Sequence, residues 1–282
     1  MRHLKRKHWI WFYGIGIGML FLSVLTLPGL SRPLAMSILD VGQGDAILIR
    51  TPEYHNILID AGPDSVVVDQ LGGRLGYFDK TIDLFILTHA HRDHYGGILD
   101  VMQKYKIKKI LLTGTHSSDP LYRAFLERVR LDGIEVFFNQ NHQDFRVGPN
   151  LYLDILYPFA GHNLVGQDVS NENNASVVAR LAQRTPGGLA PLALLTGDAE
   201  QEEEREILLA GQDVASTILK VGHHGSRTAT SDVFLAAVNP TTAVVSAGEG
   251  NTFDHPHPET LEKLGDLDVR QTMEEGTIII SF

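Results

Sequence analysis

A cluster of potential metal ligands constrains this chain more than any other feature of its sequence. Residues 89–94 read His-Ala-His-Arg-Asp-His, and they lie between the apolar run 84–88 and a helical pattern that begins at Gly97. Loops of this kind, at the carboxyl end of a buried strand, are where α/β folds place their sites. Imidazole suits zinc, manganese and iron, whereas carboxylate suits harder cations. The cluster therefore predicts a metal centre, and the alternative is a surface loop that is rich in histidine.

Two further predicted strand ends carry the same types of side chain. Asp198 follows the apolar run 192–196, and His223 and His224 follow the run 217–221. Each is a weak signal alone, because an aspartate after a strand often caps a helix. Three such clusters together predict one shared site. The chain has no cysteine, so only His, Asp, Glu and Asn remain as ligands.

The rest of the chain has the patterning of one large α/β domain. With 43% hydrophobic and 21% charged residues, its composition is that of a globular protein. Bare apolar runs, typical of strands buried on both faces, alternate with helical patterns. We expect strands at 37–40, 46–50, 56–60, 84–88, 109–112, 135–138, 151–157, 176–181, 192–196, 217–221, 243–246 and 277–281. We expect helices at 66–75, 97–105, 120–131, 200–209, 231–237 and 258–264.

Residues 1–35 differ from the rest in charge and hydropathy. They carry five basic residues and no acid, and the stretch 9–30 has no charged side chain. A helix of this length reaches about 33 Å, enough for a hydrocarbon core of about 30 Å. Because basic residues precede the stretch, we expect a cytoplasmic N-terminus, a single-pass anchor in the cell membrane within 1–35, and an extracytoplasmic domain over 36–282. The alternative is a signal peptide whose cleavage releases a secreted protein.

The expected domain is acidic. The whole chain has a net charge of −10, and the 247 residues after position 35 hold 19 basic and 34 acidic side chains, a net of −15. Such a charge argues against a broadly basic nucleic-acid surface, because phosphate contacts normally come from Lys and Arg. Arg92, Lys220 and Arg227 lie near the predicted ligands and are the local exceptions.

The motifs of this chain resemble those of the metallo-β-lactamase superfamily. The resemblance rests on His89-x-His91-x-Asp93-His94 with the later Asp198 and His223. Within the superfamily the chain is most similar to the hydrolase domain of ComEC-type DNA-uptake (competence) proteins. That similarity is carried by the stretches 39–46, 174–178, 195–200, 219–226, 245–248 and 255–256. The resemblance covers 37–282 and implies an αββα four-layer sandwich with the site at one edge.

The resemblance also implies a site with two divalent ions, zinc or manganese. The implied ligands are His89 and His91 for the first ion, Asp93, His94 and His223 for the second, and Asp198 as the bridge. Two ions clamp the attacking and leaving oxygens and lower the pKa of water. Asp93 would also orient the attacking water, so that no nucleophilic side chain is needed.

One position departs from the broad superfamily. Many members have a further histidine before the bridging aspartate, whereas the matching segment here, 171–176, reads Asn-Glu-Asn-Asn-Ala-Ser. Asn174 is therefore a candidate ligand, and the alternative is a turn residue before a strand. An amide carbonyl favours hard ions, so manganese would compete with zinc at this position.

Four more residues are candidates for the site. Asp60 would support ligating histidines from behind, or would form a turn. His255 would contact the substrate or protonate the leaving group, or would lie in a surface loop. His224 is a possible further site residue, and Ser226 would help to close a tight turn.

The implied activity is that of a membrane-anchored, dinuclear metal-dependent hydrolase that acts on phosphodiester bonds, with DNA as the suggested substrate. DNA-transport members of the family carry many membrane spans and this chain has at most one, so we expect a separate membrane channel protein as partner. One alternative is hydrolysis of a small ester or lactone. Another is a non-catalytic binding module outside the membrane, which the complete ligand set argues against.

Overall fold

The computed structural model describes residues 32–138, 144–159 and 161–282. The expected membrane anchor at 9–30 lies outside these residues. Within the described ranges, no helix has both the length and the apolar character needed to cross a bilayer. The first strand begins at Ala35, one residue before the expected start of the domain.

The first of two large sheets is mixed and comes from the first half of the chain, with one strand from its end. Its strands, in spatial order, are β16 (Ile278–Ser281), β1 (Ala35–Ile38), β2 (Ile47–Arg50), β3 (Asn56–Ile59), β5 (Leu84–Ile86), β7 (Lys109–Leu112) and β8 (Glu135–Phe138). The strands from β16 to β3 pair antiparallel, and those from β3 to β8 pair parallel. The second half of this sheet therefore points all its carboxyl ends to one edge.

The second sheet repeats this division in the other half of the chain. Its strands, in spatial order, are β15 (Asp268–Gln271), β14 (Thr242–Val245), β13 (Ile218–Lys220), β12 (Gly188–Leu195), β11 (Val178–Thr185), β10 (Leu151–Tyr157) and β9 (Phe145–Arg146). Strands β12 to β15 are parallel, and β9 to β12 are antiparallel. A separate two-stranded sheet joins β4 (Thr81–Ile82) to β6 (Lys106–Ile107).

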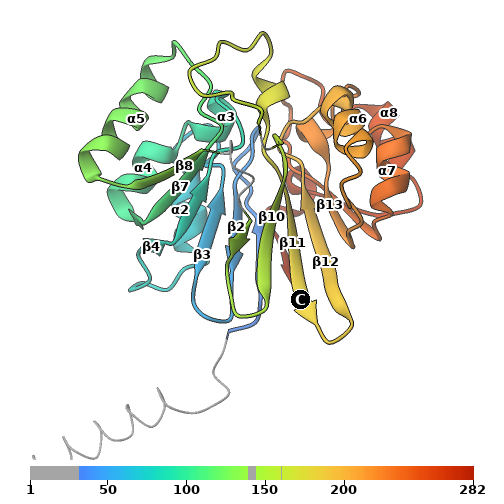
Figure 1. The fold of residues 1–282 in the computed structure, drawn as a ribbon, viewed down its shortest axis with the longest axis horizontal. Coiled ribbons are helices and arrows are strands. Elements are labelled where there is room, and N and C mark those ends of the chain that lie inside the picture. The colour runs from blue at the N-terminus through green and yellow to red at the C-terminus, as the bar shows by residue number, and fades with distance from the viewer. Residues whose placement is uncertain (1–31, 139–143, 160) are drawn as a thin grey trace, which may run out of the picture.

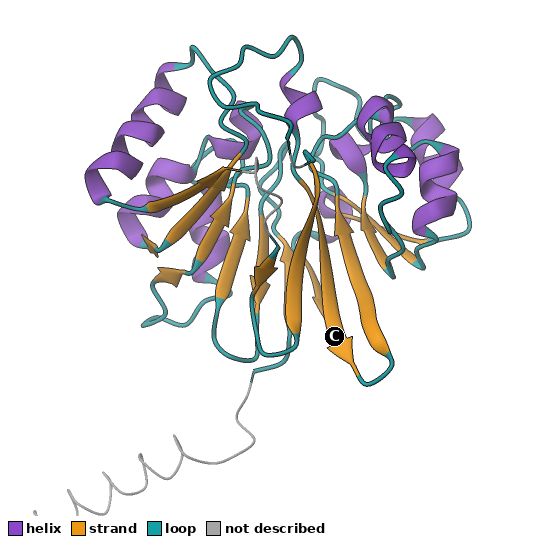
Figure 2. Ribbon diagram, viewed as in Figure 1, coloured by secondary structure: helices purple, strands orange, loops and turns teal. Residues whose placement is uncertain are grey.

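Helices cover the outer face of each large sheet (Figures 1 and 2). On the first sheet lie α2 (Val66–Gly72), α3 (Arg92–Tyr95), α4 (Ile98–Lys104) and α5 (Pro120–Asp132). On the second lie α6 (Gln201–Leu209), α7 (Asp232–Val238) and α8 (Pro258–Leu264), and the short α9 (Thr272–Glu275) precedes β16. The layers are helix, sheet, sheet, helix, so the αββα sandwich that the resemblance implies is confirmed.

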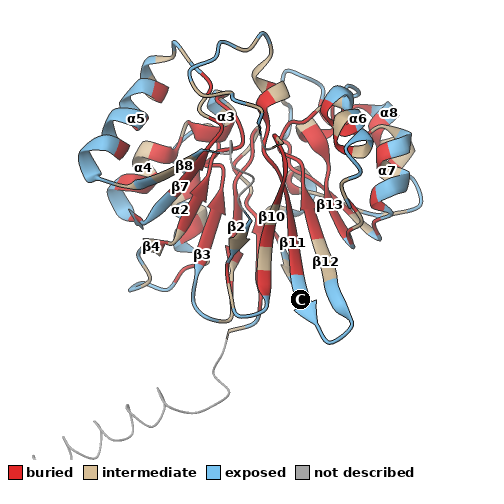
Figure 3. Cartoon of the chain, viewed as in Figure 1, coloured by how far each residue is buried: buried red, intermediate tan, exposed pale blue. Residues whose placement is uncertain are grey.

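Three apolar layers hold the sandwich together (Figure 3). The central layer lies between the sheets and includes Ile49 and Ile86 from the first sheet and Leu153 and Ala193 from the second. Separate clusters pack each sheet against its own helices. Alternate residues of one strand therefore enter different cores, which explains why the strands read as unbroken apolar runs.

The twelve strands expected from apolar runs are all present, with ends shifted by up to four residues. The expected helices are present as well, and Pro120 and Pro258 each occupy a first turn. The apolar pattern missed the two-residue strands β4, β6 and β9 and the half-exposed edge strand β15. The last of these reads Asp-Val-Arg-Gln and has no apolar run to detect.

Candidate metal centre

The predicted ligands meet because their loops leave the sheets at one edge. The loop 89–94 follows β5, Asp198 follows β12, and the 3₁₀ turn η3 (Gly222–Gly225) follows β13. Backbone hydrogen bonds hold these loops: His223 N donates to Gly197 O at 3.2 Å between the two loops of the second sheet, and Val177 N, just before β11, donates to Thr88 O of the first at 3.0 Å. Segments from both sheets therefore enclose one cluster of side chains.

Four side chains form the centre of this cluster, which we call the ligand group: Asp93, His94, Asp198 and His224. One potential ligand atom from each lies within 4.8 Å of all the others. The Asp198 Oδ2 atom is 3.3 Å from His94 Nε2 and 3.3 Å from His224 Nε2. The same His224 nitrogen is 3.4 Å from Asp93 Oδ2. Three of the four are buried, and Asp93 alone keeps a partly exposed side chain.

Asp60 orients His94 within the ligand group. Its buried carboxylate accepts hydrogen bonds from Thr88 N at 2.8 Å, Thr88 Oγ1 at 2.7 Å and His94 Nδ1 at 2.8 Å. With Nδ1 occupied, the Nε2 atom of His94 faces Asp198. The contact fits the supporting role, one of the two that the sequence left open for Asp60, and such contacts hold the ring orientation of metal-ligating histidines.

The backbone of η3 sets the direction of His224. His223 and His224 both have left-handed backbone angles, with φ of 46° and 53°, a conformation that costs about 1–3 kcal/mol for a residue other than glycine. His224 Nδ1 donates to Ser246 O at 2.9 Å, which leaves Nε2 free to face the carboxylates. The strained backbone of η3 therefore directs the Nε2 atom of His224 toward the other members of the ligand group.

The structure brings His224, and not the predicted His223, into the ligand group. His223 lies at its margin, with Nε2 3.8 Å from Asp198 Oδ2 and Nδ1 3.0 Å from Glu200 Oε1. The two rings are 6.1 Å apart and have different partners. Spacing along the chain could not distinguish these adjacent histidines, because only the backbone angles of η3 decide which one is turned inward.

His89 and His91 lie beside the ligand group as a second pair of potential ligands. His89 Nε2 is 3.0 Å from His91 Nδ1 and 3.9 Å from Asp198 Oδ2. Ser176 Oγ is 3.3 Å from His89 Nδ1 and accepts a hydrogen bond from Asp198 N at 3.2 Å. Sequence reasoning missed this serine as a site residue, although it lies in the stretch that carries the resemblance.

The remaining predicted site residues lie around this cluster. The Asn173 amide nitrogen is 3.4 Å from the His223 ring, and the backbone carbonyl of the predicted Asn174 accepts a hydrogen bond from the Tyr157 hydroxyl at 3.3 Å. Ser226 bonds to Thr228 Oγ1 at 2.9 Å within its own turn. The nearly buried His255 ring lies 5.4 Å from that of His223.

The close packing of charge shifts the pKa values of the ligand group. Burial opposes the charged form of each group, but Asp198 outweighs it and raises the pKa of both His94 and His224 well above the usual value. The same histidines hold the pKa of the Asp198 carboxyl well below its usual range and also lower that of Asp93. Burial and the neighbouring histidines lower the pKa of His255 to about 4.

Lys220 supports the site from the protein interior. It is completely buried, forms an ion pair with Asp45 and donates to Gly197 O at 3.1 Å. Burial opposes its charge, but Asp45 and Asp198 raise its pKa. The expectation that Lys220 offers its charge to a substrate phosphate is therefore wrong, because the side chain is enclosed by the protein.

The donor set fits a divalent cation. Among the described residues, His94 Nε2, His224 Nε2 and Asp198 Oδ1 are buried atoms without a hydrogen-bond partner, and Asn173 Oδ1 is another. Buried polar atoms normally have partners, and a cation would supply one for several of these atoms at once. Imidazole and carboxylate together suit zinc, manganese or iron.

Comparison with known proteins finds relatives of this chain. Residues 39–170 match the family described as the metallo-beta-lactamase superfamily. ComE operon protein 3 of Bacillus subtilis is 29% identical over 94% of this chain and 35% of its own length. Recombination protein 2 of Haemophilus influenzae is 28% identical over 95% of this chain and 31% of its own length. Competence protein ComA of Neisseria gonorrhoeae is 29% identical over 79% of this chain and 28% of its own length.

The fold is also that of solved structures. The metallo-beta-lactamase fold protein YhfI from Bacillus subtilis superposes with a TM-score of 0.57 at 14% identity, over 89% of this chain and all of that one. The chain spans about a third of the length of the curated relatives it matches.

Proposed function

This chain carries a metallo-β-lactamase domain with the ligand groups of a metal-dependent hydrolase, and on that premise we propose that it hydrolyses phosphodiester bonds, with DNA as its substrate. The observation that carries the proposal is the ligand group, in which His94 Nε2, Asp198 Oδ1 and His224 Nε2 are buried without a hydrogen-bond partner among the described residues. The choice of DNA is supported by relatives that are named for competence and recombination.

We propose that Asp93, His94, Asp198 and His224 hold one divalent cation, and that His89 and His91 hold a second beside Asp198. When bound, such cations, zinc or manganese, stabilise charge on the phosphoryl group and lower the pKa of water. Because metal ligands must be deprotonated, a cation competes with the protons that Asp198 favours on His94 and His224.

The side chains around the cations have separate tasks. Asp93 is the ligand-group member that solvent reaches, and its lowered pKa keeps it ionised, so it can accept a hydrogen bond from the attacking water. Asp60 and Ser246 hold His94 and His224 through their Nδ1 atoms. We assign substrate contact to His255, whose Nδ1 has no partner among the described residues.

The acidity of the domain limits how DNA can approach. Arg92 and Arg227 are exposed beside the ligand loops, at 68% and 60% of their side-chain surface, and each faces one carboxylate, Asp119 at 3.0 Å and Glu259 at 3.8 Å. We propose that these two arginines, together with the cations, contact the substrate phosphates. A substrate anion would exchange with Asp119 and Glu259 for the same guanidinium groups.

Membrane attachment is part of the proposal. The charge-free stretch 9–30 would anchor the protein in the cell membrane, with the metal centre outside the cytoplasm. We propose a separate membrane channel protein as the partner that carries DNA across the membrane, a role suggested by relatives named for competence. Secretion after signal cleavage is the alternative, and sequencing of the mature N-terminus distinguishes the two.

The proposal is tested with the full chain in detergent, stripped of metal and reloaded with Mn²⁺ or Zn²⁺. We expect cleavage of single- or double-stranded DNA and of a bis-aryl phosphodiester. Asp198→Ala should abolish cleavage and lower the bound metal, whereas Asp266→Ala, at an exposed aspartate, should do neither. Turnover of a carboxylic ester or lactone without cleavage of any nucleic acid would refute the phosphodiesterase assignment.

A further inference from the structure

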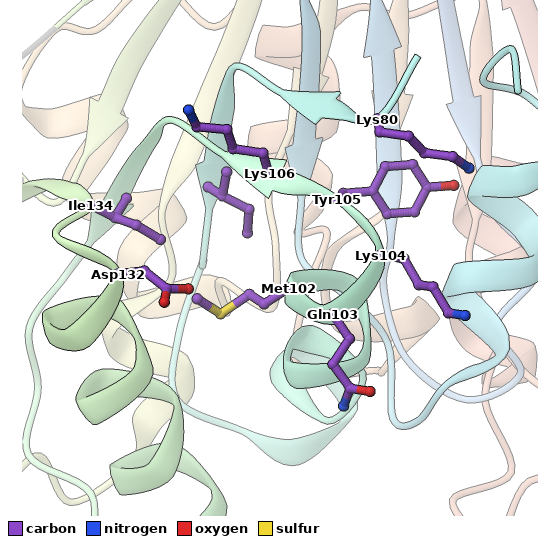
Figure 4. A pocket seen from close by; sticks show the side chains of 9 residues that line it. Lys80, Met102, Gln103, Lys104, Tyr105, Lys106, Asp132 and Ile134 are labelled. Atoms are coloured by element: carbon purple, nitrogen blue, oxygen red, sulfur yellow. The ribbon is translucent and has the colours of Figure 1, made fainter. Parts of the chain in front are cut away.

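A basic and aromatic surface lies beside β4, at the opposite end of β5 from the metal centre. We call it the aromatic–lysine face and define it by Tyr77, Phe78, Lys80, Lys104 and Lys106. The three lysines border a cavity of about 510 Å³ beside β4 and β6 (Figure 4). Strand β4 immediately precedes β5, and the ligand loop follows β5, so the two regions lie at opposite ends of one strand (Figure 1).

The three lysines of this face carry unpaired charge. Lys80, Lys104 and Lys106 are exposed, and none forms an ion pair with a residue that the structure describes. The neighbouring lysines differ, because Lys108 lies 2.7 Å from Asp83 and Lys109 lies 3.6 Å from Glu135. The acid that borders the cavity, Asp132, is itself paired with Arg128 at 2.7 Å. The face is therefore locally cationic on a domain whose net charge is −15.

Two aromatic rings stand beside these lysines without being buried. Tyr77 and Phe78 are 82% and 93% exposed, and their rings meet edge to face at 5.1 Å. Lys80 Nζ lies 5.0 Å from the centre of the Tyr105 ring and 5.9 Å from that of Tyr77. Aromatic rings next to lysines are the side chains that favour the headgroup level of a bilayer.

The chain that precedes the domain arrives at this same end. Arg32, the first described residue, donates to the backbone carbonyls of Thr51 and His55 and lies 3.6 Å from Asp79, the neighbour of Lys80. The charge-free stretch 9–30 ends two residues before it in the sequence. The face is thus adjacent to the point where this stretch joins the domain.

We propose that the aromatic–lysine face binds the anionic headgroups of a lipid bilayer and thereby turns the metal centre away from the membrane. Charge selects the orientation, because an anionic surface attracts the unpaired lysines and repels the rest of the acidic domain. Phe78 and Tyr77 then insert at headgroup depth. The inference requires neither the anchor nor the phosphodiesterase activity, so each can fail without the others.

The test uses the absence of cysteine from the chain. A single cysteine introduced by Phe78→Cys carries an environment-sensitive fluorophore, and the full chain is reconstituted with vesicles that contain a lipid-borne quencher. Phe253→Cys is the matched control, because Phe253 is also an exposed phenylalanine but precedes His255 at the metal centre. Vesicles of phosphatidylcholine alone are compared with vesicles that also contain phosphatidylglycerol.

We expect the lipid-borne quencher to quench the label at 78, and not the label at 253, when phosphatidylglycerol is present. The variant Lys80→Gln/Lys104→Gln/Lys106→Gln should lower the ratio of docked to undocked protein about a hundred-fold, since each lysine near an anionic surface contributes roughly five-fold. Lys108→Gln should change this ratio much less, because its charge is already paired.

Two results would overturn the proposal. The first is equal quenching at 78 with and without phosphatidylglycerol. The second is that single-stranded DNA, added to the protein in detergent, shields the label at 78 from solvent, and that the triple variant loses this shielding. That result would make the face a nucleic-acid surface. Loss of metal-dependent cleavage has no bearing on either result, because the metal centre lies at the other end of β5.

Discussion

The two ends of the sandwich use charged side chains in opposite ways. At the metal centre, His94, Asp198 and Lys220 are enclosed, and each has several partners within 4 Å. At the aromatic–lysine face, Lys104 and Lys106 are exposed and have no ion-pair partner in the described part of the chain. A buried charge needs a specific partner, because the cost of its desolvation must be compensated. Exposed charges act through their summed field, so each one contributes little. Single substitutions should therefore have large effects at one end and small effects at the other.

The largest difference is expected between two lysines. Lys220→Met should lower the free energy of unfolding by about 3–5 kcal/mol, because it leaves the Asp45 carboxylate buried without its cation. Lys106→Met, at the exposed end, should change it by less than about 0.5 kcal/mol. Urea unfolding of both variants gives the comparison. Equal losses of unfolding free energy in the two variants would mean that the buried Lys220–Asp45 pair contributes no more to stability than an exposed lysine.

The next largest effect separates the adjacent histidines. His224→Ala removes a member of the ligand group and should weaken metal binding by more than about a hundred-fold, beyond the range found for supporting residues. His223→Ala should weaken it less, because His223 lies at the margin against Glu200. Metal titration followed by calorimetry measures both. The reverse order would restore His223 as the ligand, as the sequence resemblance implies.

A supporting contact should matter to a smaller degree. Asp60→Asn removes the carboxylate that orients His94, and we expect metal affinity and activity to fall about 10–100-fold. Asp64→Asn is the control, since Asp64 is exposed and near in sequence. An Asp60→Asn enzyme with unchanged metal affinity would show that His94 is held by its other neighbours.

The smallest effect belongs to a half-buried carboxylate at the other end. Burial opposes the charge of Asp83, but hydrogen bonds from Lys108 and Asn56 N outweigh it and lower its pKa. The group therefore stabilises the fold above its unfolded-state pKa of about 3.9, and this contribution disappears as the pH falls through its folded-state pKa. Asp83→Asn should cost about 1 kcal/mol at pH 7 and progressively less below about pH 4. Urea unfolding at several pH values would contradict this if the cost did not depend on pH.

Much of the fold could be predicted because its strands are buried on both faces. Runs such as 84–87 and 110–112 are apolar throughout, since neighbouring residues enter different cores. The edge strand β15 and the short β4 and β6 could not be predicted, because their hydrogen bonds depend on neighbours far away in the sequence rather than on an apolar pattern.

The candidate site likewise has parts that the sequence predicted and parts that it did not. The loop 89–94 and Asp198 were expected to meet, because the strands before them end at one edge. The resemblance implied His223 as a ligand, with His224 as a possible further site residue, whereas the structure turns His224 into the ligand group. Asn174 was the candidate in the other segment, and it is the neighbouring Asn173 whose amide lies near the His223 ring. His224 and Asn173 both lie in short 3₁₀ turns, where the direction of a side chain changes from one residue to the next and leaves no periodic trace in the sequence.

The sequence by itself determined the chemistry of this protein: imidazoles and carboxylates at strand ends, no thiolate, and apolar runs sufficient for two covered sheets. Only the tertiary structure decided which donors face one another. That choice depends on φ angles of 46° and 53° in η3 and on partners such as Ser246, 22 residues from His224. The tertiary structure also gathered Lys80, Lys104 and Lys106 into one face, because the pairing of β4 with β6 joins segments that are separate in the chain.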